Sequence, residues 1–462
     1  MVHIKVKKGL DIPIKGKPEG SVKAVMASGG SSSSMPAQLA LDLKPFEGVK
    51  FRLLVKPGDV VKIGQPLAED KDALGRLFVS PAGGVVKEVR RGHKRALLDI
   101  VIDLANQEEA VAFSPISPEK ASKEEIIERL KTGGSFASMR SRPFNLLADP
   151  TKTPQCIIVK AIESALFTPS AELQVAGHEK EFQAGLNALA KLTTGAVHLV
   201  HRKGSTFPAF TGAQNAQIHT AEGPHPVGTF SVLIQHLTPI KSVNDNIWTL
   251  SARDVVAIGY LLLKGRVFVE RIIGIGGPGI VSGKTGYFKV RDGYPISTLI
   301  EGRIQKGLVR LISGDPLMGH KVEEQDFLGF NDTVFCAVPE NTDREFLHFF
   351  RVGTDKYTFS HAYFTGHLDN TNREYDFTTN QHGQPRAFID STMYDKVQPL
   401  NVPTMLLVKA VMAEDFELAE TLGILEVDSE DFALATFVCP SKMEMTEIMK
   451  AGIKQCAKEM LQ

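Results

Sequence analysis

The sequence predicts an α+β protein of several domains, and three observations support that prediction. At 462 residues, the chain is longer than a single domain of about 100 to 200 residues. Short β-branched runs separated by glycine turns fill residues 54–101, whereas strand and helix patterns alternate over residues 120–260. Residues 401–462 show helix signals. We therefore expect separate β, α/β and helical parts.

The β part is a small closed sandwich of two halves. One half reads VKPGDVVKIGQPL and the other SPAGGVV, with turns at Pro57-Gly58 and Gly83-Gly84. Glycine reaches positive φ without a Cβ penalty, and the flanking valines suit pleated strands. The pattern is similar to the biotinyl/lipoyl-type barrel-sandwich hybrid, which we expect between about Phe46 and Leu104. A fold of this kind hosts many functions.

Lys71 is the candidate attachment point if the barrel carries a lipoyl or biotinyl group. It lies between the two halves, where carrier domains place their lysine at a hairpin tip. The second half lacks its own Gly-Asp turn and has Gly92-His93-Lys94 instead. We therefore interpret Lys71 as a solvated loop lysine and keep the carrier as the alternative. An intact mass with an adduct on Lys71 would support the carrier.

The first residues alternate in polarity, with Ile4, Val6, Ile12 and Ile14 among lysines. This pattern predicts a strand pair that joins the barrel, so we assign residues 1–112 to the barrel-sandwich domain. Residues 27–37, ASGGSSSSMPA, are of low complexity and predict a flexible loop within it.

The α/β part, residues 120–260, is expected to be a Rossmann-like domain. Ser117, or Ser122 with Glu125 three residues on as a capping box, can cap a helix through Leu130. A helical pattern covers residues 170–192, and apolar runs predict buried strands at 156–160, 197–200 and 231–234. Strands that alternate with helices favour a parallel sheet with right-handed crossovers.

The remaining residues divide into three segments. Residues 261–335 are β-rich, with strands expected at 267–269, 271–273, 287–290 and 308–312. Residues 336–400 form a mixed α/β segment, with aromatic strands expected near 349–350 and 357–364. Residues 401–462 form a helical domain, a small bundle whose helices are expected to begin near Pro403, Glu414, Ser429 and Ser441 or Lys442.

Composition excludes several classes of protein. The 53 basic and 53 acidic residues balance, which argues against nucleic-acid binding as the main activity. Apolar runs such as residues 255–263 are about half of the roughly 20 residues that a membrane span needs, and the N-terminus has no signal-peptide core. We expect a cytoplasmic chain that contacts a membrane through a partner. Four cysteines, without disulfide or metal-ligand spacing, are expected to be buried thiols: Cys156, Cys336, Cys439 and Cys456.

Two glycine motifs look like nucleotide sites but lack the required context. Residues 274–279 fit G-x-G-x-x-G, yet the residues that follow predict a turn and a strand, so no helix N-terminus would hold a pyrophosphate. Gly283-Lys284-Thr285 ends a near-match to a Walker A loop in which Pro278 replaces the first glycine. Both stretches are better explained as hairpin glycines.

Cys439-Pro440 matches the end of the ferredoxin pattern C-x2-C-x2-C-x3-C-P. The other three positions of that pattern fall on Ser429, Phe432 and Ala435, none of which can ligate iron through sulfur. His219 and His225 are polar candidates without a partner at a readable spacing, and a loop or core role is the favoured interpretation. The sequence assigns no catalytic, cofactor-binding, metal-binding or quinone-binding residue.

These parts, in this order, resemble a known family. The N-terminal KKGLDIPIKG, the barrel motifs, WTLSARDVVAIGYLLLKG, GKTGYFKVRDGYPISTLIEG, LISGDPLMG and the tail EVDSEDFALATFVCPSK are similar to the A subunit of sodium-translocating NADH:quinone reductases. The resemblance covers nearly the full chain and implies a β-grasp (SLBB-like) domain at 261–335. The family is related to the C subunit of the Rnf complex and to the flavin subunit of complex I. Those relatives carry flavin on a G-x-G-G-A-G-F-P loop and iron–sulfur clusters in a C-terminal bundle.

The sequence departs from those relatives at both redox positions. Gly133-Gly134-Ser135-Phe136-Ala137-Ser138-Met139-Arg140 stands at the flavin loop, and Cys439 alone remains at the cluster. The resemblance therefore implies a cofactor-free peripheral subunit on the cytoplasmic side of the inner membrane. It implies a role in ubiquinone reduction coupled to Na⁺ export, with ubiquinone as a candidate ligand. NADH, flavins and clusters would lie on partner subunits, some of them membrane-embedded. The alternative is an autonomous flavin and iron–sulfur subunit of the Rnf or complex I kind.

Overall fold

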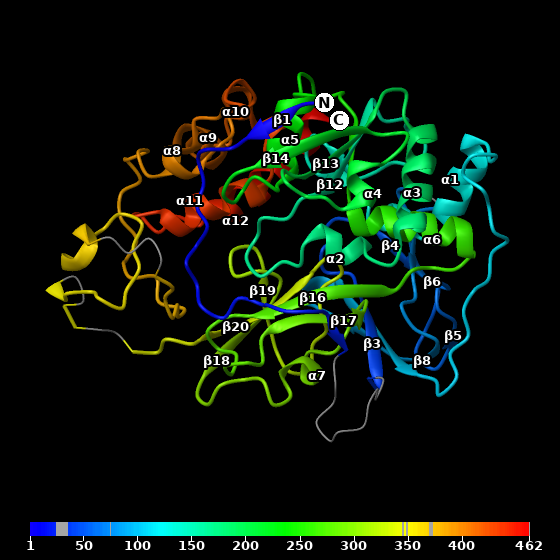
Figure 1. Cartoon of the computed structure of the whole chain (residues 1–462), viewed down its shortest axis with the longest axis horizontal. Helices are drawn as coiled ribbons and strands as arrows, with labels where there is room; N and C mark the ends of the chain where they lie inside the picture. Colours follow the sequence, from blue (N-terminus) through cyan, green and yellow to red (C-terminus); the bar gives the residue numbers. More distant parts are fainter. Residues whose placement is uncertain (25–35, 74, 344–345, 348–349, 369–372, 462) are drawn as a thin grey trace.

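The chain is described by a computed structural model that covers residues 1–24, 36–73, 75–343, 346–347, 350–368 and 373–461. Two facing β-sheets, a mixed sheet flanked by helices, a six-stranded sheet and a set of C-terminal helices make up the described part. In Figure 1 the C-terminal helices lie beside the mixed sheet, and Glu47 of the barrel pairs with Lys450 and Lys454 of the last of these helices. The predicted loop 27–37 falls largely on residues 25–35, outside the described residues.

The barrel consists of a four-stranded and a three-stranded sheet, as its two-half pattern predicts. The first has the order β3 (Gln38–Asp42), β9 (Leu97–Leu104), β8 (Gly84–Arg91), β5 (Val60–Val61). The second has the order β4 (Phe51–Leu53), β6 (Pro66–Asp70), β7 (Leu77–Val79). Gly84 is required by packing, because a Cβ there would lie 1.9 Å from the Asp103 carbonyl oxygen. Fully buried Leu39, Leu67 and Phe78 fill the space between the sheets.

The predicted strand pair at the N-terminus does not join the barrel, and that prediction is wrong. β1 (His3–Lys5) pairs in parallel with β14 (Gln217–Glu222) of the mixed sheet. β2 (Lys23–Ala24) pairs in parallel with β17 (Gly286–Arg291) of the six-stranded sheet. Alternating polarity predicts that a strand forms but carries no information about which sheet edge it meets.

The mixed sheet has the order β1-β14-β13-β12-β15-β10-β11. β12 (Cys156–Ala161), β13 (Val197–Arg202) and β15 (Ile247–Ser251) are parallel to β14 and β1, whereas β10 (Arg140–Arg142) and β11 (Leu146–Leu147) form antiparallel pairings. The strands predicted at 156–160 and 197–200 are confirmed as β12 and β13. Both have consecutive buried residues, as expected for a sheet that is covered on both faces.

Helices cover both faces of this sheet. One core cluster joins α1 (Lys123–Thr132), α2 (Ala171–Val175), α3 (Glu179–Leu192), α4 (Pro208–Thr211) and α6 (Ala252–Lys264). The cluster on the other face contains α5 (Phe230–Leu237) and the C-terminal helices. The predicted capping box of α1 is confirmed, since the Ser122 hydroxyl accepts from the Glu125 amide at 3.1 Å.

The prediction of a strand at residues 231–234 is wrong. These residues form half of α5, and the third parallel strand is β14 instead. A run of four buried apolar residues is compatible with a strand or with a helix that covers a sheet, and its length is too short to distinguish them. The helical pattern at 170–192 also divides into α2 and α3 around Gly177, which has a φ of 84°.

The six-stranded sheet has the order β19-β18-β20-β16-β17-β2, with β16 (Glu270–Gly276), β18 (Val309–Ser313), β19 (His320–Val322) and β20 (Val334–Pro339). β16 and β17 form an antiparallel hairpin in which Ile275 lies opposite Gly286. The hairpin interpretation of the two glycine motifs is therefore confirmed. A Cβ at Gly277 would lie 2.4 Å from the Ala337 carbonyl oxygen. Residues 267–269, expected as a strand, are irregular, and α7 (Ile296–Ile300) follows β17.

The segment 340–400 contains little regular structure in its described residues. It has η4 (Phe364–His367) and α8 (Tyr394–Val397), and the strand expected at 357–364 is absent from the described part of that range. Tyr357 instead packs its ring against Tyr375 and Phe377 at centroid distances of 5.5 and 5.7 Å. Phe349, of the other expected strand, lies outside the described residues, and Phe350 is not in a strand.

The C-terminal residues form helices as predicted. They are α9 (Thr404–Met412), α10 (Phe416–Thr421), η5 (Ile424–Glu426), η6 (Ser429–Phe432), α11 (Ala433–Val438) and α12 (Met445–Met460). Pro403 precedes α9 as expected, whereas α12 begins later than the predicted Ser441 or Lys442. Across the part of the chain that the structure covers, no helix has the length and apolar character to cross a bilayer.

Candidate functional site

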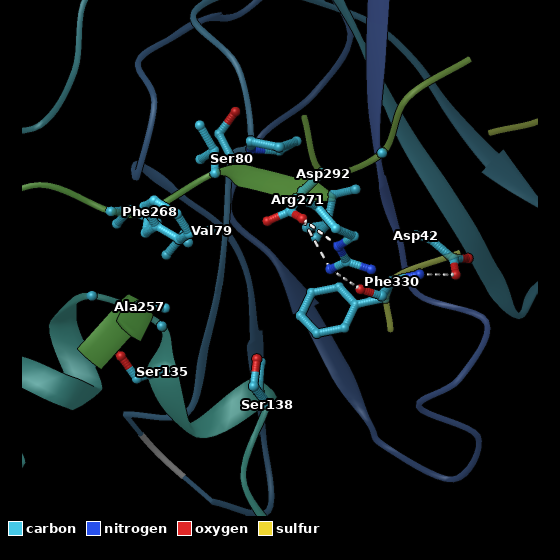
Figure 2. A pocket seen from close by; sticks show the side chains of 18 of the residues that line it. Asp42, Val79, Ser80, Ser135, Ser138, Ala257, Phe268, Arg271, Asp292 and Phe330 are labelled. Atoms are coloured by element: carbon cyan, nitrogen blue, oxygen red, sulfur yellow. Dashed lines mark hydrogen bonds and ion pairs between the residues drawn. The ribbon is translucent and has the colours of Figure 1, made fainter. Parts of the chain in front are cut away.

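A pocket of about 80 Å³ lies where the loop after α1 meets the barrel, α6 and the six-stranded sheet. Figure 2 shows the side chains that surround it. The lining is contributed by segments that are far apart in the sequence. These include Asp42, Val79, Ser80, Ser135, Ser138, Arg253, Ala257, Phe268, Arg271, Asp292 and Phe330. This junction pocket therefore exists only when all of these parts are packed together.

The loop that reaches the pocket is held in place by its own residues. α1 ends at Gly133, and Gly134 adopts a left-handed φ of 72°. A Cβ at Gly134 would lie 2.8 Å from a methyl carbon of Val79 in the barrel. Phe136 is fully buried and packs edge-on against Trp248 at 5.8 Å, which anchors the loop to the α/β core. This bulky side chain thus points away from the pocket.

Four of the six amides at residues 133–138 are not free to hold a flavin phosphate. The Gly133 and Gly134 amides donate to the carbonyls of Arg129 and Lys131, and the Ala137 and Ser138 amides donate within the loop itself. Free amides are what a phosphate cradle requires. The volume of about 80 Å³ is also well below the roughly 300 Å³ at which ligand pockets begin.

An ion-pair cluster forms one wall of the pocket. The Asp292 carboxylate accepts from Arg253 Nη2 at 2.8 and 2.7 Å and from Arg271 Nε at 2.9 Å. Arg271 also donates to the carbonyl oxygens of Phe330 and Asp332 at 2.5 and 2.8 Å. Burial lowers the pKa of Arg271, and the nearby Asp292 opposes that shift. The cluster fixes α6 to the β16–β17 hairpin.

Asp42 connects the barrel to the same wall. Its carboxylate accepts the Phe330 amide at 3.0 Å and the Lys44 amide at 3.1 Å (Figure 2). The residue is only 1% exposed, and burial raises its pKa while Lys44 opposes the rise. Asp42 therefore ties the barrel to the loop that carries Phe330.

Ser135 and Ser138 are the polar groups that remain available in the pocket. Both line it, and within the described part of the chain neither hydroxyl forms a hydrogen bond. Val79, Ala257 and Phe268 supply apolar wall opposite them. Two hydroxyl donors beside apolar walls suit a small, flat molecule with carbonyl groups. Nothing in this arrangement provides a nucleophile with a base or a pair of catalytic carboxylates.

The positions of the ferredoxin-type pattern lie in the packed C-terminal core. Phe432, Ala435 and Cys439 are at most 1% exposed. The Cys439 sulfur lies 3.1 Å from the Tyr394 hydroxyl and accepts from the Met443 amide at 3.4 Å. Burial raises the pKa of Tyr394, and its contact with Cys439 adds to the rise. These residues do not fit an iron–sulfur cluster, because side chains fill the space and only one sulfur is present among the pattern positions.

The other predicted candidates lie elsewhere. His219 is 3% exposed, with Nε2 3.0 Å from His198 Nδ1, and His225 has Nδ1 3.0 Å from the Ser164 hydroxyl. Burial lowers the pKa of both histidines to about 4. Lys71 is exposed next to β6. All four cysteines are buried and free, as predicted. Across the described residues, no group of three histidine, cysteine or acidic side chains could hold a metal ion.

Sequence reasoning did not indicate that Arg253, Arg271 and Asp292 would meet. They come from a helix N-terminus, a strand and the turn that follows β17, and no motif spacing links them. Ser135 and Ser138 could be located in the loop after α1 from the sequence. That their hydroxyls line a pocket could not be predicted, because it depends on how the loop folds. The local sequence signals were Asp292 in a turn that contains a glycine and Arg271 near the start of a strand, and neither predicts the ion-pair cluster.

Comparison with known proteins places these domains in one family. Three family models match: the NqrA N-terminal barrel-sandwich hybrid domain at residues 4–105, the NqrA second alpha/beta domain at 121–267 and the NQRA C-terminal domain, of SLBB type, at 272–324. The barrel-sandwich hybrid and the SLBB-like domain are thus confirmed as domain types.

Full-length relatives agree with the domain matches. The A subunit of the Na(+)-translocating NADH-quinone reductase of Chlamydia caviae is 37% identical, with 99% of this chain and 97% of the relative covered. The same subunits of Chlamydia pneumoniae and Hahella chejuensis are 36% and 35% identical, with 99% of this chain and 98% and 100% of the relatives covered. The chain belongs to the NqrA family, the A subunits of Na⁺-translocating NADH-quinone reductases.

Proposed function

We propose that this chain is a peripheral subunit of a membrane NADH:ubiquinone oxidoreductase that couples ubiquinone reduction to Na⁺ export. In this proposal it acts in the quinone-reducing step and as a scaffold, on the cytoplasmic side of the inner membrane. NADH, flavins and iron–sulfur clusters are bound by partner subunits, some of them embedded in the membrane. Family membership supports the subunit role.

One structural observation supports the proposal that this chain binds no redox cofactor. Protein atoms satisfy most of the loop amides at the first position and fill the second, where the flavin and iron–sulfur relatives hold their groups. The amides of Gly133, Gly134, Ala137 and Ser138 have carbonyl partners. Phe432 and Tyr394 pack where a cluster would need open space. A group cannot enter either place unless the local fold changes.

We also infer that the α/β domain is Rossmann-like and that the C-terminal helices act as a small bundle. The order β14-β13-β12-β15, all parallel, supports the first inference, because the chain switches sides of the sheet after β14. Core contacts that join α9, α11 and α12 to the sheet support the second. The α/β domain then supplies α6 and the loop after α1 to the junction pocket.

The junction pocket is the place in this proposal where a ubiquinone headgroup binds. Its walls are apolar and the Ser135 and Ser138 hydroxyls can donate to quinone carbonyl oxygens. At about 80 Å³ the pocket is closed, so the barrel must separate from α6 before a ring can enter. A scaffold role and a quinone role are compatible in this proposal, because contacts with partner subunits would control whether the pocket opens.

Replacement of both hydroxyls tests the quinone site. We expect Ser135→Ala/Ser138→Ala, in the assembled complex, to raise KM for a short-chain ubiquinone about three- to tenfold, as the loss of ordinary hydrogen bonds predicts. The matched control is Ser282→Ala, in an exposed turn, which should leave KM unchanged. An unaltered KM in the double variant would exclude this pocket as the quinone site.

Co-purification tests the subunit role. A tagged chain, extracted from membranes in mild detergent, should elute with the other subunits of the complex and with NADH-dependent quinone reductase activity. Elution of the chain alone, from an extract in which the remaining subunits are present, would contradict the proposal.

A further inference from the structure

A second hollow, of about 390 Å³, lies on the barrel between β4 and the end of the β8–β9 hairpin. Its volume falls in the range of ligand pockets, roughly 300–1,000 Å³. Apolar side chains from both sheets form part of it, including Phe51, Leu53 and Leu97. Figure 1 shows β4 and β8 within the barrel, and Glu47, which precedes β4, pairs with Lys450 and Lys454 of α12. The hollow shares no lining residue with the junction pocket.

The charged residues that line this hollow are all basic: Arg52, Lys71, Arg91 and Arg95. The whole chain is balanced at 53 basic and 53 acidic residues, so this is a local concentration of charge. Arg52 pairs with Glu69. Among the described residues, the side chains of Lys71, Arg91 and Arg95 form no ion pair. An occupant with several negative charges would complement them.

One wall of the hollow is the open edge of a sheet. β4 pairs with β6 on one side and is the outer strand of its sheet. Lys71 donates to the Lys50 carbonyl and Leu54 donates to the Leu67 carbonyl, so the even-numbered residues bond to β6. In an antiparallel ladder the alternate residues then turn their N–H and C=O groups outward. Within the described chain, the main-chain groups of Phe51 and Leu53 have no partner on that outer side.

The opposite wall is a hairpin end with a fixed shape. The Gly92 amide donates to the Ala96 carbonyl at 2.8 Å, and the Arg95 amide donates back to Gly92 at 3.1 Å. Arg91 also donates a side-chain bond to the Arg95 carbonyl at 3.1 Å. Lys94 and Arg95 have positive φ values of 52° and 62°, a costly backbone shape for non-glycine residues. The cationic side chains are therefore presented in advance across from the free edge of β4.

We propose that this hollow binds an extended, acidic segment of another subunit of the complex, which adds to β4 as an extra strand. Main-chain bonds to Phe51 and Leu53 would hold the segment, as in other cases of strand addition. Because strand side chains alternate, the segment carries acidic residues at every second position, facing Arg52 and Lys71. Charged residues beside an open strand edge disfavour pairing with uncharged strands. The basic lining of the hollow therefore favours an acidic segment. This inference rests on the subunit role proposed above.

Charge reversal tests the proposal with the full-length chain. The probe is membrane from cells that make the other subunits but lack this chain, and the readout is the concentration of chain needed for half-maximal binding. We expect Lys71→Glu/Arg91→Glu/Arg95→Glu to weaken binding about tenfold or more and to reduce its dependence on salt. The control, Lys284→Glu/Lys306→Glu, changes two exposed lysines of the six-stranded sheet region and should bind like the wild type.

Two further arms identify the occupant. Membranes without any subunit of the complex, and vesicles of phosphatidylglycerol, should bind the wild type poorly. Equal binding to either would show a lipid surface and overturn the proposal, as would unchanged binding of the triple variant. A photo-crosslinking residue at position 53 should label a stretch rich in Asp and Glu on a partner subunit. A label on lipid or on a partner helix, or no label while binding persists, would also overturn it.

The two proposals fail separately. A chain that contains no cofactor and assembles normally, but is indifferent to these reversals, would refute the docking edge alone. Circular dichroism of each variant confirms that it is folded before binding is measured.

Discussion

Cys439 and Tyr394 illustrate how single residues set what this chain can do. The thiol lies 3.1 Å from the tyrosine hydroxyl inside an apolar core. Phe432 and Ala435, which take two of the positions that cluster ligands would need, are fully packed beside them. The core is thereby stabilised by burial of aromatic and aliphatic side chains.

Gly259 is a second residue on which the fold depends. It lies where α6 crosses α3, and a Cβ there would be 1.7 Å from the Glu181 carbonyl oxygen. We predict that Gly259→Ala destabilises the protein by about 1–3 kcal/mol, the usual cost of overpacking, measured by urea unfolding. The control, Lys180→Ala on the exposed side of α3, should change stability little. Equal stability of the two variants would mean that the helices can move apart freely.

At the scale of elements, η6 is the segment that links the C-terminal helices to the mixed sheet. Asp428 closes a capping box with Asp431, and Asn145 donates to the Asp428 carboxylate. Arg142, only 1% exposed, donates to the Ser231 hydroxyl of α5 at 3.1 Å and to the Glu426 carbonyl at 3.1 Å. These contacts bring the acidic residues Glu426, Asp428 and Asp431 close together beside the mixed sheet.

Glu430 in η6 should make stability depend on pH. Burial, followed by Asp431 and Asp428, raises its pKa from 4.5 to about 8, while Lys160 and Arg142 oppose the rise. Between these values the folded chain keeps a proton that the unfolded chain has lost. The contribution to stability is therefore fully present below about pH 4.5 and is lost as the pH rises towards 8.

Glu430→Gln should remove the loss of stability at high pH, because a glutamine side chain stays uncharged. We expect its melting temperature to exceed that of the wild type at pH 8 and the difference to shrink at pH 5, in melts followed by circular dichroism. Glu417→Gln, on the exposed side of α10, is the matched control and should show no such trend. A pH-independent difference between Glu430→Gln and the wild type would contradict the account.

Most elements could be predicted from the sequence, and the failures have physical reasons. The capping box at Ser122 and the buried strands β12 and β13 carry strong local signals. The run at 231–234 was predicted as a strand but forms α5, because a helix that covers a sheet buries the same residues. Aromatic residues near Tyr357 were predicted as a strand but pack in a cluster of rings. Local pattern does not report tertiary pairing.

At the scale of the whole molecule, the N-terminal segment binds the domains together. β1 completes the mixed sheet and β2 completes the six-stranded sheet, while the barrel follows directly in sequence (Figure 1). The junction pocket arises only from this assembly, since Asp42, Ser135 and Asp292 come from three different domains, and Arg253 from the same domain as Ser135. No sequence motif spans such distances, so the pocket could not be predicted even though the domain types could. The missing cluster ligands could be recognised in the sequence, because each of them is a single residue in a motif of fixed spacing.

The cofactor content of the purified full-length chain tests the central claim most directly. Its absorbance spectrum, together with iron and flavin analysis, should show protein absorbance alone, because most amides of the loop after α1 are already bonded and side chains fill the cluster position. Bound flavin, or about four irons per chain as a cluster would supply, would contradict the account and favour an autonomous flavin and iron–sulfur subunit.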